Sequence, residues 1–460
     1  MQVQAGTGLY FIFLATVFFL YWGCARSRLA RLSIVLAANF VFLAHYGLFY
    51  IFLIPACATI DYLVGLALTR FQAQAARRAL VGVSVAVNLS LLVGSRHMGW
   101  FLSPGWNWVF PLGLSFYTLQ ALTYTLDIYR RDAERTGSLL AHLSAVSFFP
   151  TLQAGPITRV PELIKQFAQP PALDRLMGGR AFFLIGLGLL KKTLIADFLA
   201  ENLVNRVFDT PNLYSGAQAL MAVYAYSLQL YFDFSGYTDI ARGAGMLLGV
   251  ELPRNFDRPY LSVNVAEFWR RWHMSFSSWL RDYLYFSIPG KRTKVMPYAG
   301  LVITMLLGGL WHGVTWTFAI WGVLHGGALA LARWRQMRRR ESHAQPRFGR
   351  AGRYLAIFGT YQFVCFTWIF FRAGSLTEAG QILQRIGSLT VGLESFSPLL
   401  AVVLGLSAAT LFLPREWHAR AMDRFASSPF YVHAAALAAV VAAIQLLGGR
   451  GNVAFVYSRF

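Results

Sequence analysis

The chain has 460 residues, of which 56% are hydrophobic, 16% aromatic and only 13% charged. Soluble domains usually carry about 25% charged residues, so this composition cannot cover a water-exposed surface. Together with apolar runs from end to end, it indicates one polytopic membrane domain and excludes a secreted, fibrous or disordered protein.

The charge balance is 41 Lys and Arg against 20 Asp and Glu, a formal net charge of +21. In a soluble protein such an excess would suggest nucleic-acid binding. Here the basic residues gather in short loops between apolar runs, as at Arg26, Arg28 and Arg31 and again from Arg333 to Arg340. This is the pattern of the positive-inside rule, so we expect no nucleic-acid partner.

The first third of the chain alternates regularly between apolar runs and basic loops. No Lys or Arg precedes the first run, so we interpret it as a retained span with its N-terminus outside, not as a cleaved signal. Every basic cluster then falls on one side, which we expect to be cytoplasmic. The predicted features are a span over Leu9–Trp22, a pair of spans turning outside near His45–Leu48, a span over Leu80–Gly94, an outer loop over Arg96–Asn107 and a span over Trp108–Tyr129.

The middle third is irregular, because Pro, Gly and charges interrupt its apolar stretches. Irregular or charged backbone at membrane depth is tolerated where it lines a polar cavity or is buried in protein. We therefore predict re-entrant helices around a central polar chamber. The stretches concerned are SFFPTLQAGPITR from Ser147, YFDFSGYTDIARG from Tyr231 and EFWRRWHMSFSSWLRDYLY from Glu267.

The last third is regular again and completes an all-α membrane fold. We predict a polytopic protein with about eleven transmembrane helices plus re-entrant pieces. Its last predicted spans lie near Thr315–Leu331, Tyr354–Phe371, Leu399–Leu413 and Val432–Leu447.

The segment Glu267–Tyr285 has helical periodicity over its whole length. Its aromatic residues recur at steps of three and four on one face, and Glu267 precedes Arg271 by four residues. The pattern predicts one helix with an aromatic face and an internal ion pair. His273 lies one position from that face, so it is either a histidine packed in an aromatic core or a polar group lining the chamber.

The motif GGLWHG, Gly308–Gly313, follows an apolar run. Its glycines carry no Cβ and allow a backbone or a bulky ligand to come close. We expect His312 on an exposed shoulder inside the membrane, where a histidine is by default a functional candidate and can take up a proton near neutral pH. The alternative is that the glycines serve helix packing and His312 is only structural.

Other features indicate chemistry more weakly. Asp233 and Asp239 in FDFSGYTD could bind a cation or line a proton path, although the SxxD spacing also fits a helix cap. Lys191 and Lys192 interrupt an apolar run, which snorkelling to an interface would explain. Neither the histidine spacings nor the three isolated cysteines indicate a metal site.

Several stretches together resemble the membrane-bound O-acyltransferase (MBOAT) family, of the bacterial alginate O-acetyltransferase type. The similarity runs in order along nearly the whole chain and is most specific from Arg254 to Gly326. It implies one membrane domain over residues 1–460, with a catalytic core at about 108–375. The stretches are LGLSFYTLQALTYTLDIYR, FFPTLQAGPITR, LQLYFDFSGYTDIARG, RNFDRPYLSVNVAEFWRRWHMSFSSWLRDYLY, GGLWHGVTWTFAIWGVLHG, FTWIFFRA and the terminal AFVYSRF.

The resemblance implies roles for particular residues. His312 corresponds to the histidine of the family's WHG motif and would be the general base on an acceptor hydroxyl. His273, in RRWH, is its usual partner and could stabilise an oxyanion, as could Trp311 or Tyr283. A covalent acyl-histidine intermediate is an alternative. The substrate-binding residues that we expect are Trp311, Trp272, Tyr283, Asp233 and Asn255.

The resemblance also implies substrates and partners. We expect no bound cofactor, acetyl-CoA or another thioester as the cytoplasmic donor, and a periplasmic acetyltransferase that passes the acetyl group to a polysaccharide. The expected location is a Gram-negative inner membrane. The alternatives are transfer of D-alanine from a carrier protein to teichoic acid, and a transporter, which would predict inverted repeats that the sequence does not show.

Overall fold

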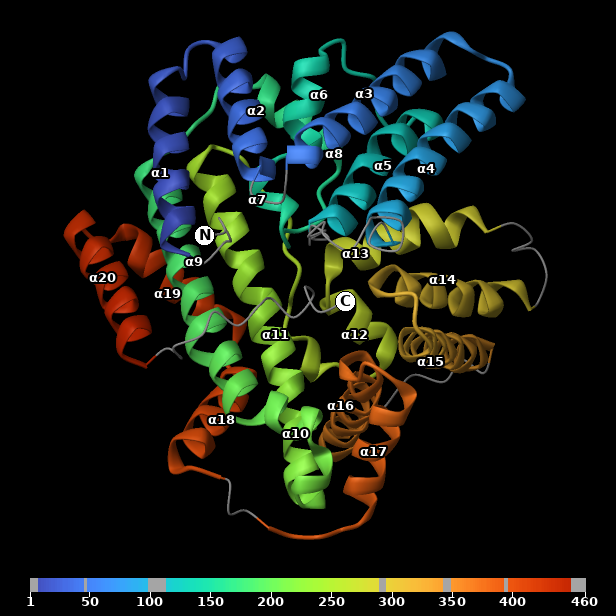
Figure 1. The fold of residues 1–460 in the computed structure, drawn as a ribbon, viewed down its shortest axis with the longest axis vertical. Helices are drawn as coiled ribbons and strands as arrows, with labels where there is room; N and C mark the ends of the chain where they lie inside the picture. Colours follow the sequence, from blue (N-terminus) through green and yellow to red (C-terminus); the bar gives the residue numbers. More distant parts are fainter. Residues whose placement is uncertain are drawn as a thin grey trace. The chain divides into compact units, whose positions relative to one another are not determined.

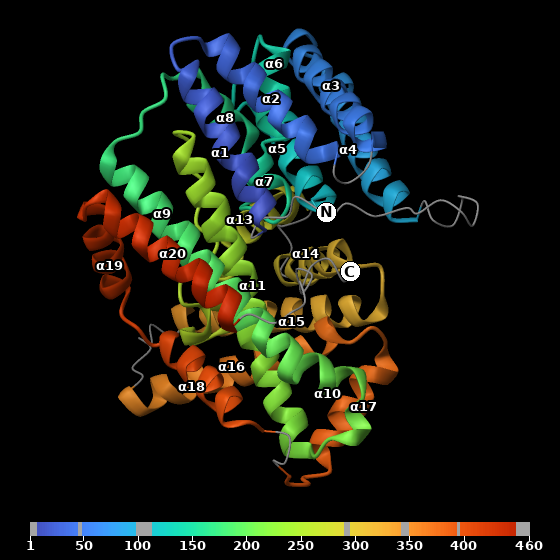
Figure 2. The same ribbon diagram turned by 60° about the vertical axis from the view of Figure 1, so that its left-hand side comes forward.

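The computed structural model describes residues 7–44, 48–97, 113–288, 295–341, 349–392 and 396–447. Every regular element in these ranges is a helix, and no strand occurs among them, as the all-α class predicts. The predicted turn at 45–47 and most of the predicted outer loop, residues 98–107, lie outside these ranges. Figure 1 and Figure 2 show the helices coloured along the chain.

The described residues form two compact units. The first comprises residues of Met1–Gly188, Tyr237–Pro253 and Met422–Ala435, and the second those of Leu189–Gly236, Arg254–Ala421 and Ala436–Phe460. The prediction of a single domain stays a prediction.

The first unit contains the helices predicted from the first third of the sequence. The predicted runs Leu9–Trp22 and Leu80–Gly94 fall within helices, whereas the run Trp108–Tyr129 is helical from Leu114 and its residues 108–112 lie outside the described ranges. The helices are α1 (Gly8–Gly23), α2 (Arg28–Ala44), α3 (Leu48–Arg70), α4 (Gln74–His97), α5 (Leu114–Arg130), α6 (Leu139–Val146), α7 (Phe149–Leu152), α8 (Val160–Ala168) and α9 (Arg175–Leu189).

Two buried amide side chains hold the irregular segment after α6. Asn39 on α2 donates to the Ser144 carbonyl at 3.2 Å and accepts from the Phe149 N–H at 2.9 Å. Gln120 on α5 donates to the Ala145 carbonyl at 3.2 Å and accepts from the Thr158 N–H at 3.3 Å. These bonds satisfy backbone groups where the helical pattern ends, so the segment can be buried in protein. The predicted polar chamber stays a prediction.

The second unit contains the segments that carry the two candidate histidines. Its elements are the π-helical segments η2 (Leu190–Asp197) and η3 (Ala200–Val204), then α10 (Asn205–Asp209), the 3₁₀ turns η4 (Pro211–Leu213) and η5 (Pro259–Leu261), and α12 (Val265–Arg271). They continue with α13 (Met274–Trp279), η6 (Leu280–Leu284), η7 (Tyr285–Ser287), α14 (Met296–His312), α15 (Trp316–Glu341), α16 (Arg350–Arg372), α17 (Leu376–Gly387) and α18 (Pro398–Thr410).

Helix α11 (Gly216–Leu247) contributes to both units and corrects one prediction. The sequence predicted an interrupted segment from Tyr231, but these residues lie inside one continuous 32-residue helix, which also excludes the helix-cap interpretation. Asp233 pairs with Lys192 at 2.9 Å, and Asp239 lies 3.9 Å from Arg242 on the next turn. Because cations compensate these carboxylates, the helix need not break to expose them.

Three described helices are long and apolar enough to cross a membrane: Phe49–Arg70 in α3, Gln74–Gly94 in α4, and α16. Helix α18 and α19 (Arg415–Ser427) together pass the same test but meet at a bend of 97°. Helix α20 (Phe430–Leu447) is apolar, and large apolar side chains such as Phe52 and Tyr354 are 75% and 70% exposed, which suits contact with lipid. The predicted count of about eleven spans is not confirmed by these helices.

Helices α14 and α15 form a close hairpin in the second unit (Figure 1). A Cβ added to Gly309 would lie 2.4 Å from the Phe318 carbonyl oxygen, and one added to Gly326 would lie 2.6 Å from the Val302 Cα. The two backbones can approach this closely only because both positions lack a side chain. Gly309 of the GGLWHG motif therefore does serve helix packing.

Candidate functional site

The segment around His273 is broken, not helical throughout as the sequence predicted. Helix α12 ends at Arg271 and α13 begins at Met274, so Trp272 and His273 form the break. His273 has φ 42° and ψ 55°, in the left-handed region that non-glycine residues seldom occupy. The predicted ion pair is confirmed, because Arg271 contacts Glu267 one turn before it on α12.

The break is held by the preceding segment at residues 255–257, which belongs to no helix. The Asp257 N–H donates to the Arg271 carbonyl at 2.9 Å, and the Met274 N–H donates to the Asn255 carbonyl at 3.0 Å. The Asn255 side-chain oxygen also accepts from the Ser275 N–H at 3.1 Å and from Ser275 Oγ at 2.6 Å. Periodicity could not reveal this break, because its cause lies outside the segment.

The break places the His273 ring in a buried aromatic environment. The side chain is only 1% exposed. Its ring lies 4.6 Å from Phe234, edge to face, and 4.9 Å from Phe276, with which it stacks.

His312 is the last residue of α14, directly before Gly313. The sequence predicted that His312 lies on an exposed shoulder, but its side chain is only 5% exposed. A residue at the end of a helix is still buried when aromatic side chains of other segments cover it. The covering rings belong to Phe276 at 5.7 Å, Trp311 at 4.8 Å, Phe318 at 6.0 Å, Trp321 at 5.4 Å and Phe371 at 5.0 Å.

Phe276 connects the two histidines. Its ring contacts both imidazoles and stacks on Trp311 with centroids 4.7 Å apart. The structure therefore brings His273, His312 and Trp311 into one cluster, whereas their catalytic role stays a prediction.

The cluster combines two imidazoles, which can accept or donate a proton, with aromatic rings that bury them. Charge that develops in such a site interacts more strongly with nearby dipoles than it would in water. Among the described residues, no three His, Cys, Asp or Glu side chains come together as metal ligands would.

The other predicted substrate-binding residues have different surroundings. Trp272 packs against Phe256, Phe268 and Trp368 with centroids 5.1 to 5.5 Å apart. Tyr283 lies in η6 and contacts Trp279 at 5.4 Å. Asn255 holds the break described above, and Asp233 belongs to an ion cluster, so these two residues have clear structural roles.

The ion cluster of Asp233 overturns the snorkelling interpretation of Lys192. The Lys192 ammonium is 2.7 Å from Asp197 and 2.9 Å from Asp233, and its side chain is only 6% exposed. A buried ammonium needs such partners, because burying an isolated charge costs several kcal/mol. Asp233 is followed directly by Phe234, which contacts His273, so the cluster anchors the part of α11 beside the site.

His325 is a third buried histidine, and its chemistry differs from that of the other two. Its Nδ1 accepts from the Trp269 indole N–H at 3.2 Å, and its Nε2 therefore donates to Thr367 Oγ1 at 2.9 Å. Both ring nitrogens are committed, and the bonds join α12, α15 and α16. The sequence predicts no role for this residue, because a histidine in the stretch GVLHG contains no signal for a bridge between three helices.

Comparisons with known proteins agree with the resemblance seen in the sequence. The model of the membrane-bound O-acyltransferase family matches residues 104–373. A probable alginate O-acetylase of Azotobacter vinelandii is 36% identical over 397 residues, covering 82% of this chain and 76% of that protein. A peptidoglycan O-acetyltransferase of Helicobacter pylori is 35% identical, covering 80% and 75%. A teichoic acid D-alanyltransferase of Streptococcus thermophilus is 31% identical, covering 48% and 56%.

Proposed function

Because this chain belongs to the membrane-bound O-acyltransferase family, we propose that it takes an acetyl group from acetyl-CoA on the cytoplasmic side and passes it across the bacterial inner membrane. The acceptor is a polysaccharide outside, reached through a periplasmic acetyltransferase partner. About eleven spans would enclose this route. Similarity to the two O-acetyltransferases extends over 80% or more of the chain, and to the D-alanyltransferase over 48%, which favours acetyl transfer.

The observation that carries the proposal is the meeting of His312 and His273 at Phe276 inside a buried aromatic cluster. His312 would take the proton of the acceptor hydroxyl while the hydroxyl oxygen attacks the thioester carbonyl. The tetrahedral intermediate would collapse by breaking its C–S bond, and the thiolate would receive that proton from His312. His273 or the Trp311 indole N–H would stabilise the oxyanion.

The test is acetyl-CoA consumption and acetyl transfer by the full chain in vesicles, with and without a periplasmic acceptor protein. His312→Ala should lower the rate at least about 100-fold, because a general base contributes that much or more. His418→Ala, which removes an exposed histidine on α19, is the matched control and should leave the rate unchanged.

A His312→Ala protein that transfers acetyl groups like the wild type would move the chemistry elsewhere. A wild type that consumes no acetyl-CoA but accepts D-alanine from a carrier protein would replace acetyl transfer by D-alanylation.

A further inference from the structure

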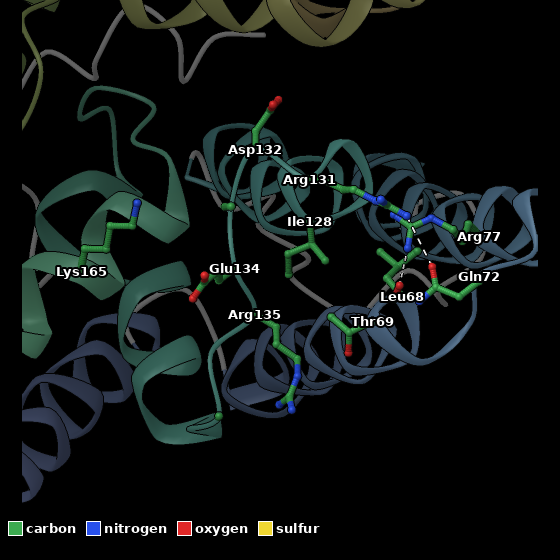
Figure 3. A pocket seen from close by; sticks show the side chains of 12 residues that line it. Leu68, Thr69, Gln72, Arg77, Ile128, Arg131, Asp132, Glu134, Arg135 and Lys165 are labelled. Carbon is green, nitrogen blue, oxygen red and sulfur yellow. Dashed lines mark hydrogen bonds between the residues drawn. The ribbon is translucent and has the colours of Figure 1, made fainter.

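The first unit contains a large cavity that is separate from the histidine cluster. It has a volume of about 1180 Å³ and lies where α3 and α5 end, beside the start of α4, the segment at 131–137, and α8 (Figure 3). Ligand sites in proteins commonly have volumes of about 300–1,000 Å³, so there is room for a sizeable polar group.

The lining of this cavity is predominantly cationic. Four basic and two acidic side chains line it, so it carries two net positive charges. They are Arg77, Arg131, Arg135 and Lys165, with Asp132 and Glu134. Figure 3 shows the Asp132 carboxylate pointing away from Arg135, so the two charges are not neutralised against each other.

The four basic residues differ in whether their charged groups already bind other parts of the protein. Arg77 is buried and donates to the Tyr129 carbonyl at 2.7 Å and to the Leu68 carbonyl, which closes the ends of α5 and α3. Arg131 donates weakly to Gln72 at 3.4 Å. Arg135 and Lys165 are exposed, and neither has an ion pair with any described residue.

The position of the cavity in the chain suits a ligand at a membrane surface. Helices α3 and α4 are span candidates, so residues 70–74 between them mark a membrane interface. Arg77 and Arg131 belong to basic clusters that the positive-inside rule predicts to be cytoplasmic, and both line the same cavity as Arg135 and Lys165. Leu68, Ile128 and Ala133 add an apolar wall next to the cations.

We propose that this cavity binds the phosphate of an anionic ligand on the cytoplasmic side, with Arg135 and Lys165 as its principal contacts and Arg131 as a third. Phosphate oxygens accept hydrogen bonds from guanidinium and ammonium groups, and cationic pockets beside transmembrane helices bind lipid headgroups. Two sources supply this chemistry: an anionic phospholipid of the leaflet, and the nucleotide part of a CoA thioester. The site does not require any chemistry at His312.

Binding of two probes to the purified full chain tests the proposal. The probes are short-chain phosphatidylglycerol and CoA, each titrated at low and high salt. Arg135→Gln/Lys165→Gln should weaken binding of at least one probe by roughly 10- to 30-fold, an effect that should shrink at high salt. Asp132→Asn/Glu134→Gln should tighten it, because two repelling charges are removed.

Arg333→Gln/Arg335→Gln is the matched control, since it also removes two exposed positive charges, from α15. Loss of lipid binding alone identifies a headgroup site, and loss of CoA binding alone identifies a donor site. Unchanged binding of both probes in the cavity variant, or an equal loss in the control variant, overturns the proposal. His312→Ala should bind the probes like the wild type, so failure of the acyl-transfer proposal would be seen separately.

Discussion

The three buried histidines that the structure describes in the second unit have different neighbours, although their burial is similar. His273, His312 and His325 are 1%, 5% and 0% exposed. Both ring nitrogens of His325 are held between an indole and a hydroxyl, which leaves no position for a substrate proton. The rings of His273 and His312 instead share a contact with Phe276, beside Trp311. This shared position is the physical reason why the proposal gives proton transfer to His273 and His312.

Lys192 should matter for folding because it compensates two buried carboxylates. Lys192→Met leaves Asp197 and Asp233 without this cation and should destabilise the protein by about 3–5 kcal/mol. The change would be measured as the melting temperature of the purified protein. Lys192→Met/Asp197→Asn/Asp233→Asn should recover most of the loss, since the charges are then removed together. A Lys192→Met protein as stable as the wild type would show that Lys192 does not compensate the two carboxylates.

The position of His273 at the break between α12 and α13 should depend on Asn255. Asn255→Ala removes the acceptor of two bonds to Ser275 and should displace His273. Because small displacements at a reacting group are costly, the acyl-transfer rate should fall at least about tenfold.

Asn264→Ala is the control for that experiment. The Asn264 side chain caps α12 through the Glu267 N–H at 2.9 Å, away from the break. Its loss should cost about 1 kcal/mol of stability but leave the rate per folded molecule unchanged. Equal rates for the Asn255→Ala and Asn264→Ala proteins would contradict a positioning role for Asn255.

The hairpin of α14 and α15 offers two adjacent glycines with opposite surroundings. Gly326→Ala places a Cβ 2.6 Å from Val302 and should cost about 1–3 kcal/mol, because the helices must separate. Gly327 has nothing within 4 Å of an added Cβ, so Gly327→Ala should be neutral or slightly stabilising. Melting temperatures of the two variants measure the difference. Similar destabilisation by both substitutions would mean that the contact between α14 and α15 does not cause the loss of stability.

The elements that sequence patterns predicted well are those whose cause is local. The helices α1, α4 and α16 could be predicted from the apolar residues of their own segments alone. The break at His273 and the continuity of α11 were missed because Asn255 and Lys192, which cause them, lie elsewhere in the chain. His312 and His273 were found through the resemblance of their motifs. Their shared contact with Phe276 required the fold.

At the scale of the whole molecule, the helices of the first unit agree with the charge pattern of the sequence. If α1 to α5 each cross the membrane in turn, the segments after α1, α3 and α5 lie on one side. These segments contain or adjoin Arg26, Arg28, Arg70, Arg77 and Arg131. The segments after α2 and α4 then face the other side. If one of these five helices did not cross, the basic segments would fall on both sides of the membrane.

Reporter fusions should place these segments directly. Green fluorescent protein fused after residues 26, 72 and 133 should fluoresce, and alkaline phosphatase fused there should be inactive, because Arg-rich segments are retained in the cytoplasm. Phosphatase fused after residue 46 should be active. The fusion after residue 133 also tests the cavity, since Ala133 lines it. Active phosphatase at that position would put the cationic cavity outside, where neither the cytoplasmic leaflet nor CoA could reach it.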